Sequence, residues 1–420
     1  MDLFKPCYDY AEPRFARAAG VYPFFQALDA SEGPVVRYEG RDVVMLGSNN
    51  YLGLTHHPAV TQAAIQAVED FGTSCTGSRF INGNLRIHQE LEQELADFFG
   101  YEQALVFSSG FLANLGVLAA LGNLPDAILF SERGNHASLI DGTRLARCDV
   151  RLFDDPDDLA TQLAERDCWE NALVITDAVF SMTGRVSDLK AYAALKRQYG
   201  FKLYVDDAHG IGVFGPQGRG VVYDQGVREE VDLLFGTFSK SLASQGGFVC
   251  GEEAVIDYLR HKARSLIFTA GLAPPTVAAA LAALRVMKTE GEELIGKVWE
   301  NARFWKQGLD ELGFCTLRSN ATIVPVLIGS ESLAFVVSRT LLERGVFAIP
   351  VPYPVVPFGQ SLIRTSVMPS HTREHLELAL DAFAAVKDQY PIPDFDPDQL
   401  PVAEQEDWSW FMPQAASETR

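Results

Sequence analysis

Short apolar runs alternate with amphipathic stretches between about residues 60 and 290 of this 420-residue chain. The amphipathic stretches, such as 87–99 and 189–199, have the apolar spacing of one helix face. The apolar runs have the length and composition of buried strands, and they are 104–107, 127–130, 150–153, 172–176, 202–205, 233–235 and 247–250. Strands that alternate with helices form a mostly parallel sheet covered on both faces. We therefore predict an α/β fold that binds its ligand beyond the carboxyl ends of the strands.

The remaining segments suggest further divisions of the chain. Residues 1–45 are predicted to form an N-terminal arm with a short helix and two strands, and residues 46–290 the large domain. A helix-rich segment leads into a smaller α+β domain, predicted over residues 291–390.

Residues 391–420 form a tail that is acidic and rich in proline, which is typical of a mobile extension. Trp408, Trp410 and Phe411 are unusual in such a segment, because exposed aromatic side chains usually find an apolar surface. The sequence leaves open whether the tail docks on the body of the protein or stays in solvent.

Composition argues against several classes of function. The net charge of −20 is unfavourable for a nucleic-acid partner, which requires basic surface. The six cysteines lack paired spacing, so no metal site is predicted. The N-terminus lacks a signal pattern, and no apolar run reaches the roughly 18 residues of a membrane span. We expect a cytoplasmic protein without a transmembrane segment, and loose association with the inner face of the membrane is left open.

Two charged residues and their sequence context indicate a specific chemistry. Asp206 follows the apolar run 202–205, and Lys240 stands among glycines and hydroxyls in the run 236–241. A lysine can form a Schiff base with the aldehyde of pyridoxal 5′-phosphate (PLP), and a carboxylate can pair with the pyridinium nitrogen of that cofactor. The sequence therefore predicts a PLP site.

A phosphate site is predicted nearby. Ser109, Gly110 and Phe111 follow a strand and open a helix, so their backbone N–H groups and the helix dipole favour an anion. An ordinary helix N-cap is the alternative. Thr237 and Ser239 are candidates for further hydroxyl donors.

Other candidates surround the cofactor ring or the substrate. His136 follows a strand and is a candidate to lie on the pyridine face, with a structural role as the alternative. His209 is a candidate to hydrogen-bond the ring oxygen or to shuttle a proton. Ser181 is a candidate for the same edge of the ring, although it also fits a turn. Arg364 interrupts an apolar strand and therefore needs an anion, either a substrate carboxylate or an internal salt-bridge partner.

Five segments together resemble the α-oxoamine synthases, which are PLP enzymes that condense amino acids with acyl thioesters. These segments are 49–54, 76–79, 135–138, 206–209 and 236–240. The resemblance runs in unbroken order from about residue 20 to 388.

The resemblance implies both the fold and the roles of single residues. The implied fold is PLP-dependent transferase fold type I, with a mostly parallel sheet in the large domain and a smaller α+β C-terminal domain. Lys240 is implied to hold the cofactor, Asp206 to pair with its nitrogen and His136 to stack on its ring. The residues implied to surround the phosphate are Ser109, Gly110, Phe111, Thr237 and Ser239.

The resemblance also implies an assembly and a substrate site. Members of the family are homodimers whose active sites use both subunits, so Thr269 is implied to reach the phosphate site of the partner. His209 and Ser181 are implied to lie near the ring. Asn50 and Arg364 match the positions that hold the substrate carboxylate.

Segments 75–83, 236–244 and 361–364 resemble the bacterial serine palmitoyltransferase branch of the family. That branch implies condensation of L-serine with a long-chain acyl-CoA or acyl carrier protein to a 3-ketosphinganine-type base. Segment 353–357 is closer to the glycine-using 2-amino-3-ketobutyrate CoA ligases, and Ala178 replaces a usual glycine.

These departures leave the amino acid open among serine, glycine and cysteate. An aminotransferase is a further alternative with the same cofactor, and a silent subunit is disfavoured by the presence of a lysine. The residues predicted to carry the chemistry are Lys240, His136, Asp206 and His209.

Overall fold

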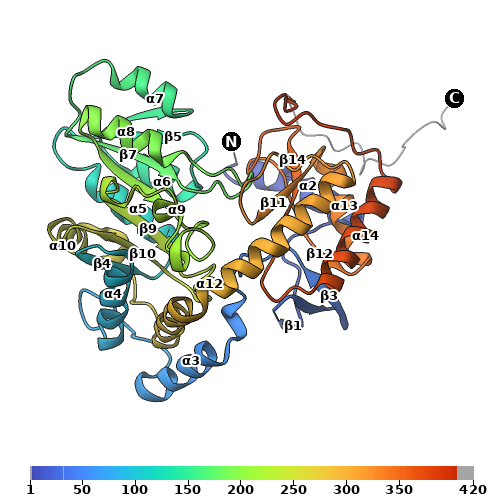
Figure 1. The fold of residues 1–420 in the computed structure, drawn as a ribbon, viewed down its shortest axis with the longest axis horizontal. Helices are drawn as coiled ribbons and strands as arrows, with labels where there is room; N and C mark the ends of the chain where they lie inside the picture. Colours follow the sequence, from blue (N-terminus) through green and yellow to red (C-terminus); the bar gives the residue numbers. More distant parts are fainter. Residues whose placement is uncertain (1, 32, 404–420) are drawn as a thin grey trace. The chain divides into compact units, whose positions relative to one another are not determined.

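The computed structural model describes residues 2–31 and 33–403 (Figure 1). Contacts divide the chain into two compact units. Asn49–Ser181 and Arg185–Trp299 form the first, called here the large unit. The described residues before Asn49 and after Trp299, together with Met182–Gly184, form the second, called here the small unit.

A seven-stranded sheet forms the centre of the large unit, in the order β4-β10-β9-β8-β7-β5-β6. The strands are β4 (Gln103–Phe107), β5 (Ile128–Glu132), β6 (Asp149–Phe153), β7 (Ala172–Asp177), β8 (Lys202–Asp206), β9 (Leu233–Thr237) and β10 (Gly247–Gly251). All pairs are parallel except those of β10 with β4 and β9. Every residue of β5, β7, β9 and β10 is buried, because helices cover both faces. The prediction of a mostly parallel α/β fold is confirmed.

Helices connect these strands, and the sequence sets several of their ends. They are α3 (Pro58–Phe71), α4 (Arg86–Phe99), α5 (Gly110–Leu121), α6 (Ala137–Leu145), α7 (Pro156–Leu163), α8 (Leu189–Tyr199), α9 (Val221–Asp224), α10 (Glu253–Lys262), α11 (Arg264–Ile267) and α12 (Pro274–Glu311), the last contributing residues to both units. Helices α4 and α8 end at Gly100 and Gly200, which adopt positive φ values of 60° and 76°. Helix α5 is apolar on nearly all sides and packs against α6, α10, α11 and β10, so it belongs to the core.

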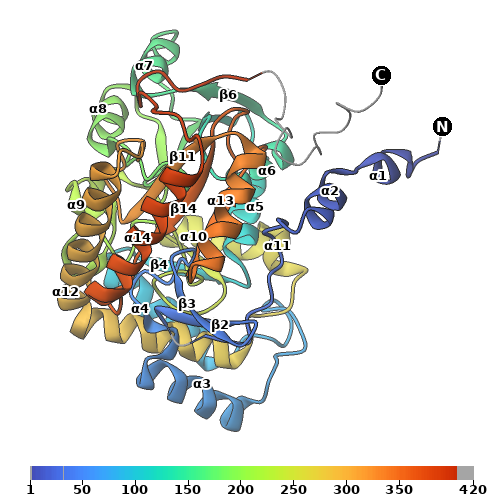
Figure 2. The same cartoon turned by 90° about the vertical axis from the view of Figure 1, so that its right-hand side faces the viewer.

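The small unit contains two sheets. One has the order β1-β2-β3-β12 and the other the order β11-β14-β13. Their strands are β1 (Ala30–Ser31), β2 (Val35–Tyr38), β3 (Arg41–Met45), β11 (Ile323–Gly329), β12 (Val346–Phe347), β13 (Ile349–Val351) and β14 (Ser361–Ser366). The helices are α1 (Lys5–Asp9), α2 (Glu12–Ala18), α13 (Glu331–Glu343) and α14 (Arg373–Gln389), and α13 packs on α14, β11 and β14 (Figure 2).

The described part of the acidic tail docks on the small unit. The amide of Gln360 donates to the carbonyl of Pro401 at 3.0 Å, and the N–H of Ala403 donates to the carbonyl of Phe358 at 3.2 Å. The ring of Phe395 lies so close to Gly329 that an added Cβ there would approach it to 2.9 Å. The tail therefore contacts the body up to residue 403, whereas Trp408, Trp410 and Phe411 lie outside the described residues.

Within residues 2–31 and 33–403, no helix has the length and apolar character needed to span a membrane.

Candidate active site

One cavity of about 240 Å³ in the large unit collects most of the predicted site residues. It lies where β4, β5, β7, β8 and β9 end, which is the position expected for ligands of a parallel sheet. The predicted residues that line it are Ser109, Gly110, Phe111, His136, Ser181, Asp206, His209, Thr237, Ser239 and Lys240.

Asp206 provides a buried carboxylate at the end of β8. Asp206 is only 4% exposed. Oδ1 accepts a hydrogen bond from the N–H of Ala208 at 3.0 Å, and Oδ2 accepts one from Nδ2 of Asn114 at 2.9 Å. Burial raises the pKa of Asp206, while Lys240 and the bond from Asn114 oppose this effect. A cation against this carboxylate would favour its ionised form.

Asn114 holds Asp206 in place, and the sequence analysis did not identify it. Its amide also donates to Oγ of Ser138 at 2.9 Å, and its carbonyl accepts from the hydroxyl of Tyr204 at 2.5 Å. Asn114 lies in the otherwise apolar helix α5 and is 1% exposed. A single amide in an apolar helix was the available signal, because a buried amide needs polar partners.

A second carboxylate lies next to the first. Asp177 ends β7 and pairs in register with Asp206 of β8. It lines the same cavity, and Oδ2 accepts from the backbone N–H of His136 at 2.9 Å. Burial raises the pKa of Asp177 well above its usual range, and Asp206 raises it further. Asp177 therefore fixes the backbone at His136 and was missed by the sequence analysis.

His136 presents a neutral ring to the cavity. It precedes α6, and its Nδ1 accepts from the N–H of Ser138 at 3.3 Å and lies 2.8 Å from the Ser138 hydroxyl. Burial lowers the pKa of His136, and Lys240 lowers it further against the effect of Asp206. A neutral imidazole can lie against a cationic ring without charge repulsion.

Another group of lining residues is suited to an anion. The side chain of Ser109 caps α5 by accepting from the N–H of Phe111 at 3.2 Å. An added Cβ at Gly110 would lie 3.1 Å from Oγ1 of Thr237, so glycine allows the helix end to approach β9. The hydroxyls of Thr237 and Ser239 lie 2.9 Å apart. Two hydroxyls beside a helix N-terminus form a favourable phosphate site.

Lys240, Ser181 and His209 also line the cavity. Lys240 is half-buried and acts electrostatically on Asp206, Asp177 and His136. Nδ1 of His209 lies 2.6 Å from the hydroxyl of the fully buried Tyr51, which fixes the imidazole.

The residues present fit PLP. The helix N-terminus with two hydroxyls suits its phosphate, and Lys240 suits its aldehyde. Burial raises the pKa of Asp206 more than its partners lower it, so this carboxylate suits the cationic ring nitrogen of PLP.

Three predicted residues lie elsewhere. Asn50 and Thr269 belong to the large unit but do not line the cavity. Asn50 is buried, and its amide donates to Oγ1 of Thr55 at 2.9 Å. Arg364 lies on β14 in the small unit and is 8% exposed.

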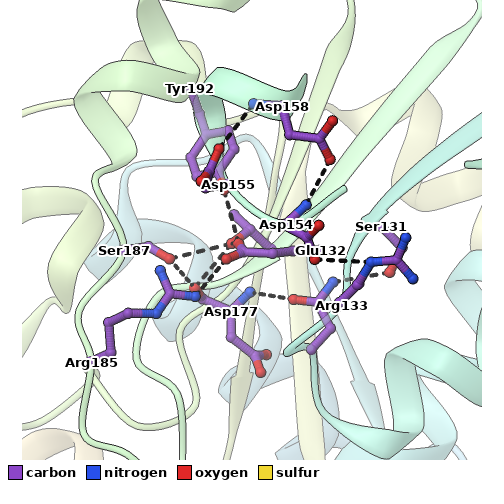
Figure 3. A network of polar contacts seen from close by, with 12 residues as sticks. Ser131, Glu132, Arg133, Asp154, Asp155, Asp158, Asp177, Arg185, Ser187 and Tyr192 are labelled. Atoms are coloured by element: carbon purple, nitrogen blue, oxygen red, sulfur yellow. Dashed lines mark hydrogen bonds and ion pairs between the residues drawn. The ribbon is translucent and has the colours of Figure 1, made fainter. Parts of the chain in front are cut away.

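A network of polar contacts in the large unit includes Glu132, Arg185 and Tyr192 (Figure 3). Glu132, at the end of β5, is 1% exposed and accepts from Arg185 at 2.5 Å. It also accepts from the hydroxyls of Thr176 and Tyr192, at 2.6 and 2.9 Å.

The network continues through Phe180, the residue before Ser181. The guanidinium of Arg185 lies 3.7 Å from the centre of the Phe180 ring. That ring contacts Gly134, where an added Cβ would approach it to 2.8 Å. The network therefore connects the segment before His136 with the segment before Ser181.

Comparisons with known proteins show the family of the chain. The family model described as aminotransferase class I and II matches residues 41–383. A serine palmitoyltransferase from Bacteriovorax stolpii is 46% identical over 377 residues, which is 89% of each chain. An 8-amino-7-oxononanoate synthase from Thermoanaerobacter pseudethanolicus is 42% identical over 379 residues, which is 90% of this chain and 95% of that one.

Solved structures of the same family have the same fold. A serine palmitoyltransferase variant from S. paucimobilis, with PLP and myriocin bound, has a TM-score of 0.87 and 33% identity, covering 93% of this chain and 99% of that one.

The fold and the cavity together define a PLP-dependent transferase of fold type I. Within that class, the chain belongs to the α-oxoamine synthase family, as its relatives show. It is an enzyme of the acyltransferase type, and its cofactor is PLP.

Proposed function

We propose that this enzyme condenses L-serine with a long-chain acyl thioester, releasing the thiol and CO2 and forming a 3-ketosphinganine-type base. The observation that carries the proposal is the cavity that unites Lys240, Asp206 and His136 in a chain 46% identical to a serine palmitoyltransferase. The acyl donor is a long-chain acyl-CoA or acyl carrier protein.

PLP, when bound, supplies an aldehyde that condenses with amines and a protonated ring that withdraws electrons from the substrate Cα. Lys240 would hold the aldehyde carbon, and the carboxylate of Asp206 would hold the ring nitrogen. The phosphate would be bound by the helix end and hydroxyls formed by Ser109, Gly110, Phe111, Thr237 and Ser239. His209, fixed by Tyr51, and Ser181 would orient the ring through its oxygen.

The side chains of the protein divide the remaining work. Lys240, once its amine is free, would take the proton from the serine Cα, because a neutral amine in a half-buried site is a competent base. The neutral ring of His136 would hold the substrate orientation and donate to the thioester carbonyl through the nitrogen that does not face Ser138. Arg364 and Asn50 would bind the serine carboxylate, the arginine with its planar fork.

We also propose a homodimer in which Thr269 of one subunit reaches the phosphate site of the other. Phe268, the preceding residue, is 71% exposed, and Ile81 in another surface segment of the large unit is 83% exposed. Exposed apolar side chains of this size are typical of surfaces that bind another protein. Sedimentation analysis of the purified enzyme tests this assembly.

The amino acid is tested by absorbance titration of the PLP-loaded enzyme with serine, glycine, alanine and cysteate, followed by thiol release from palmitoyl-CoA. Serine should perturb the spectrum at the lowest concentration and support thiol release. A site that binds the serine hydroxyl loses energy when glycine or alanine leaves its partner unpaired.

A second candidate is the same condensation with another amino acid, which the 42% identity to an 8-amino-7-oxononanoate synthase favours. Thiol release supported by alanine, glycine or cysteate alone would establish it in place of serine. Formation of a keto acid without thiol release would instead identify an aminotransferase.

A further inference from the structure

A second cavity of the large unit, of about 260 Å³, lies at the other ends of the strands that carry the cofactor site. It is lined by the first residues of β5, β7, β8 and β9, by the carboxyl end of α5 and by the start of α10. Strand β8 contributes Lys202 to this cavity and Asp206 to the cofactor cavity. These two positions are about 13 Å apart along the strand, at roughly 3.3 Å per residue, so the two cavities are separate.

Apolar side chains of the core form much of the wall. Leu129, Leu173 and Leu233 are 1%, 6% and 3% exposed and belong to the core cluster of the large unit. Leu121 and Val255 pack against that cluster and also line the cavity. Protein interiors contain few voids larger than a water molecule. A cavity that reaches the core at nearly the size of small-molecule sites, which begin at about 300 Å³, is therefore a candidate ligand site.

The charged lining residues favour a cation. Lys202 lines the cavity, but its Nζ lies 3.3 Å from the carboxylate of Asp232, which Lys196 also contacts. Within residues 2–31 and 33–403, no arginine or histidine lines the cavity. The other acidic lining residues are Glu170 and Glu252, which are exposed, and no cation of the described chain pairs with either. The lining therefore has two carboxylates that are free to attract a positive charge.

Backbone groups around the cavity favour the same sign of charge. The carboxyl end of α5 carries negative partial charge. The N–H of Ile128, at the start of β5, is already used by the carbonyl of Asn171 at 3.1 Å. The N–H of Leu203 on β8 donates to the Asp232 carboxylate at 2.7 Å. Although α10 begins beside the cavity, the side chain of Glu252 does not cap it, so this carboxylate remains available to a ligand.

We infer that this cavity binds an amphiphilic cation, a molecule with one ammonium group and a single alkyl chain. The chain would lie on the apolar wall, and the ammonium group would face Glu170 and Glu252 at the solvent edge. A carboxylate or phosphate in that place would be repelled by the same two side chains. The inference does not depend on the proposed function, because the two cavities share no lining residue.

The test is a calorimetric titration of the PLP-loaded enzyme with octyltrimethylammonium, octanol and octanoate, each below the concentration at which it forms micelles. The quaternary head group cannot form a Schiff base with the cofactor. Octyltrimethylammonium should bind about tenfold more tightly than octanoate, with octanol between them. Tetramethylammonium, which lacks the chain, should bind about a hundredfold more weakly than octyltrimethylammonium, because it buries no methylenes.

Two variants test whether the ligand lies in this cavity. The double variant Glu170→Gln/Glu252→Gln should reduce the preference for the cation over octanoate to about threefold or less, with octanol binding unchanged. Leu124 lines the cavity and is 41% exposed, so Leu124→Lys should fold. It should weaken binding of the cation by about tenfold and strengthen that of octanoate.

The matched controls are Glu253→Gln and Leu145→Lys. Glu253 is the exposed neighbour of Glu252, and Leu145, at the end of α6, is 55% exposed. Neither residue lines the cavity. Both control variants should keep the full preference for the cation.

Equal affinities for octyltrimethylammonium and octanoate would overturn the inference, as would a preference that the Glu170→Gln/Glu252→Gln enzyme keeps. Equal effects of Leu124→Lys and Leu145→Lys would also overturn it, because they would place the cation elsewhere, for example against the carboxylates of the cofactor cavity. If serine fails to perturb the cofactor spectrum while the expected selectivity holds, the proposed function fails and the cation site stands.

Discussion

Replacement of Asp206 by Asn should slow the condensation strongly. Asp206 is 4% exposed and lines the cofactor cavity together with Lys240. The substitution preserves the shape of the side chain and removes the negative charge available to the cofactor ring nitrogen. Removing one partner of a buried charge pair costs about 3–5 kcal/mol. If that cost falls on the transition state, the rate falls by about two to four factors of ten.

The hydrogen bonds of Asp206 add a second cost. Oδ1 and Oδ2 accept from the N–H of Ala208 and from Nδ2 of Asn114. Asparagine has a single acceptor oxygen, so its NH2 group must face one of these two donors. A lost buried hydrogen bond costs about 1–3 kcal/mol. Because this cost falls on cofactor retention and stability, the PLP content of the variant must be measured beside its rate.

Asp207→Asn is the matched control. Asp207 is fully buried, does not line the cavity and accepts from the N–H of Val222 at 3.3 Å. Burial raises the pKa of Asp207 well above its usual range, so a neutral amide is a close substitute. The assay is thiol release from palmitoyl-CoA with serine. An Asp206→Asn enzyme with full PLP content and a rate within tenfold of wild type would refute the reasoning, as would an equal loss in both variants.

The other predictions concern residues with different roles. Lys240→Ala should fold, as judged by circular dichroism, but lose turnover. In the wild type, borohydride reduction and peptide mapping should find the cofactor on Lys240. A label on another lysine would contradict the assignment. Arg364→Ala should weaken serine binding more than Arg364→Lys in absorbance titrations, and unchanged binding would assign Arg364 another partner. Arg185→Ala should lower kcat by about tenfold to a hundredfold through misplaced loops, with PLP content unchanged, and a normal kcat would confine Arg185 to stability. Burial lowers the pKa of His88 and His371 from 6.5 to about 4. Between about pH 4 and about pH 6.5 the unfolded chain therefore binds more protons than the folded one. The free energy of unfolding in urea should fall by about 3 kcal/mol for each histidine as the pH falls from about 6.5 toward 4.

The strands could be predicted because a run of apolar residues indicates a buried strand. The end of β5 shows the limit of this signal. The predicted strand 127–130 ends before Glu132, where β5 ends. Glu132 is polar in the sequence but 1% exposed in the structure, because Arg185, Thr176 and Tyr192 bond to it. Partners so distant in sequence leave no local pattern. The reversed direction of β10 is likewise set by its pairing with β4 and β9.

The candidate site was predictable where a residue type and a strand end coincide. Lys240 and Asp206 combine a reactive group with such a position, and the structure places both in one cavity. Asp177 has the same signal, since it directly follows a predicted strand, and the same reasoning applied to every strand end would have found it. Asn114 was harder to identify, because its importance depends on contacts with Asp206 and Tyr204 across the core.

Two adjacent carboxylates, Asp177 and Asp206, favour a positively charged group of the ligand at their end of the cavity. Asp177 and Asp206 are register partners on β7 and β8, and burial raises the pKa of each. The N–H of His136 favours the charged form of the Asp177 carboxylate, whereas Lys240 and Asn114 favour that of Asp206. With Lys240 bonded to the cofactor as proposed, the ring nitrogen would supply the positive charge beside Asp206. Cofactor binding and ionisation of Asp206 must then favour each other, because each stabilises the charge of the other. This coupling would offset the cost of burying Asp206, and it would make the carboxylate, the lysine and the cofactor one electrostatic unit.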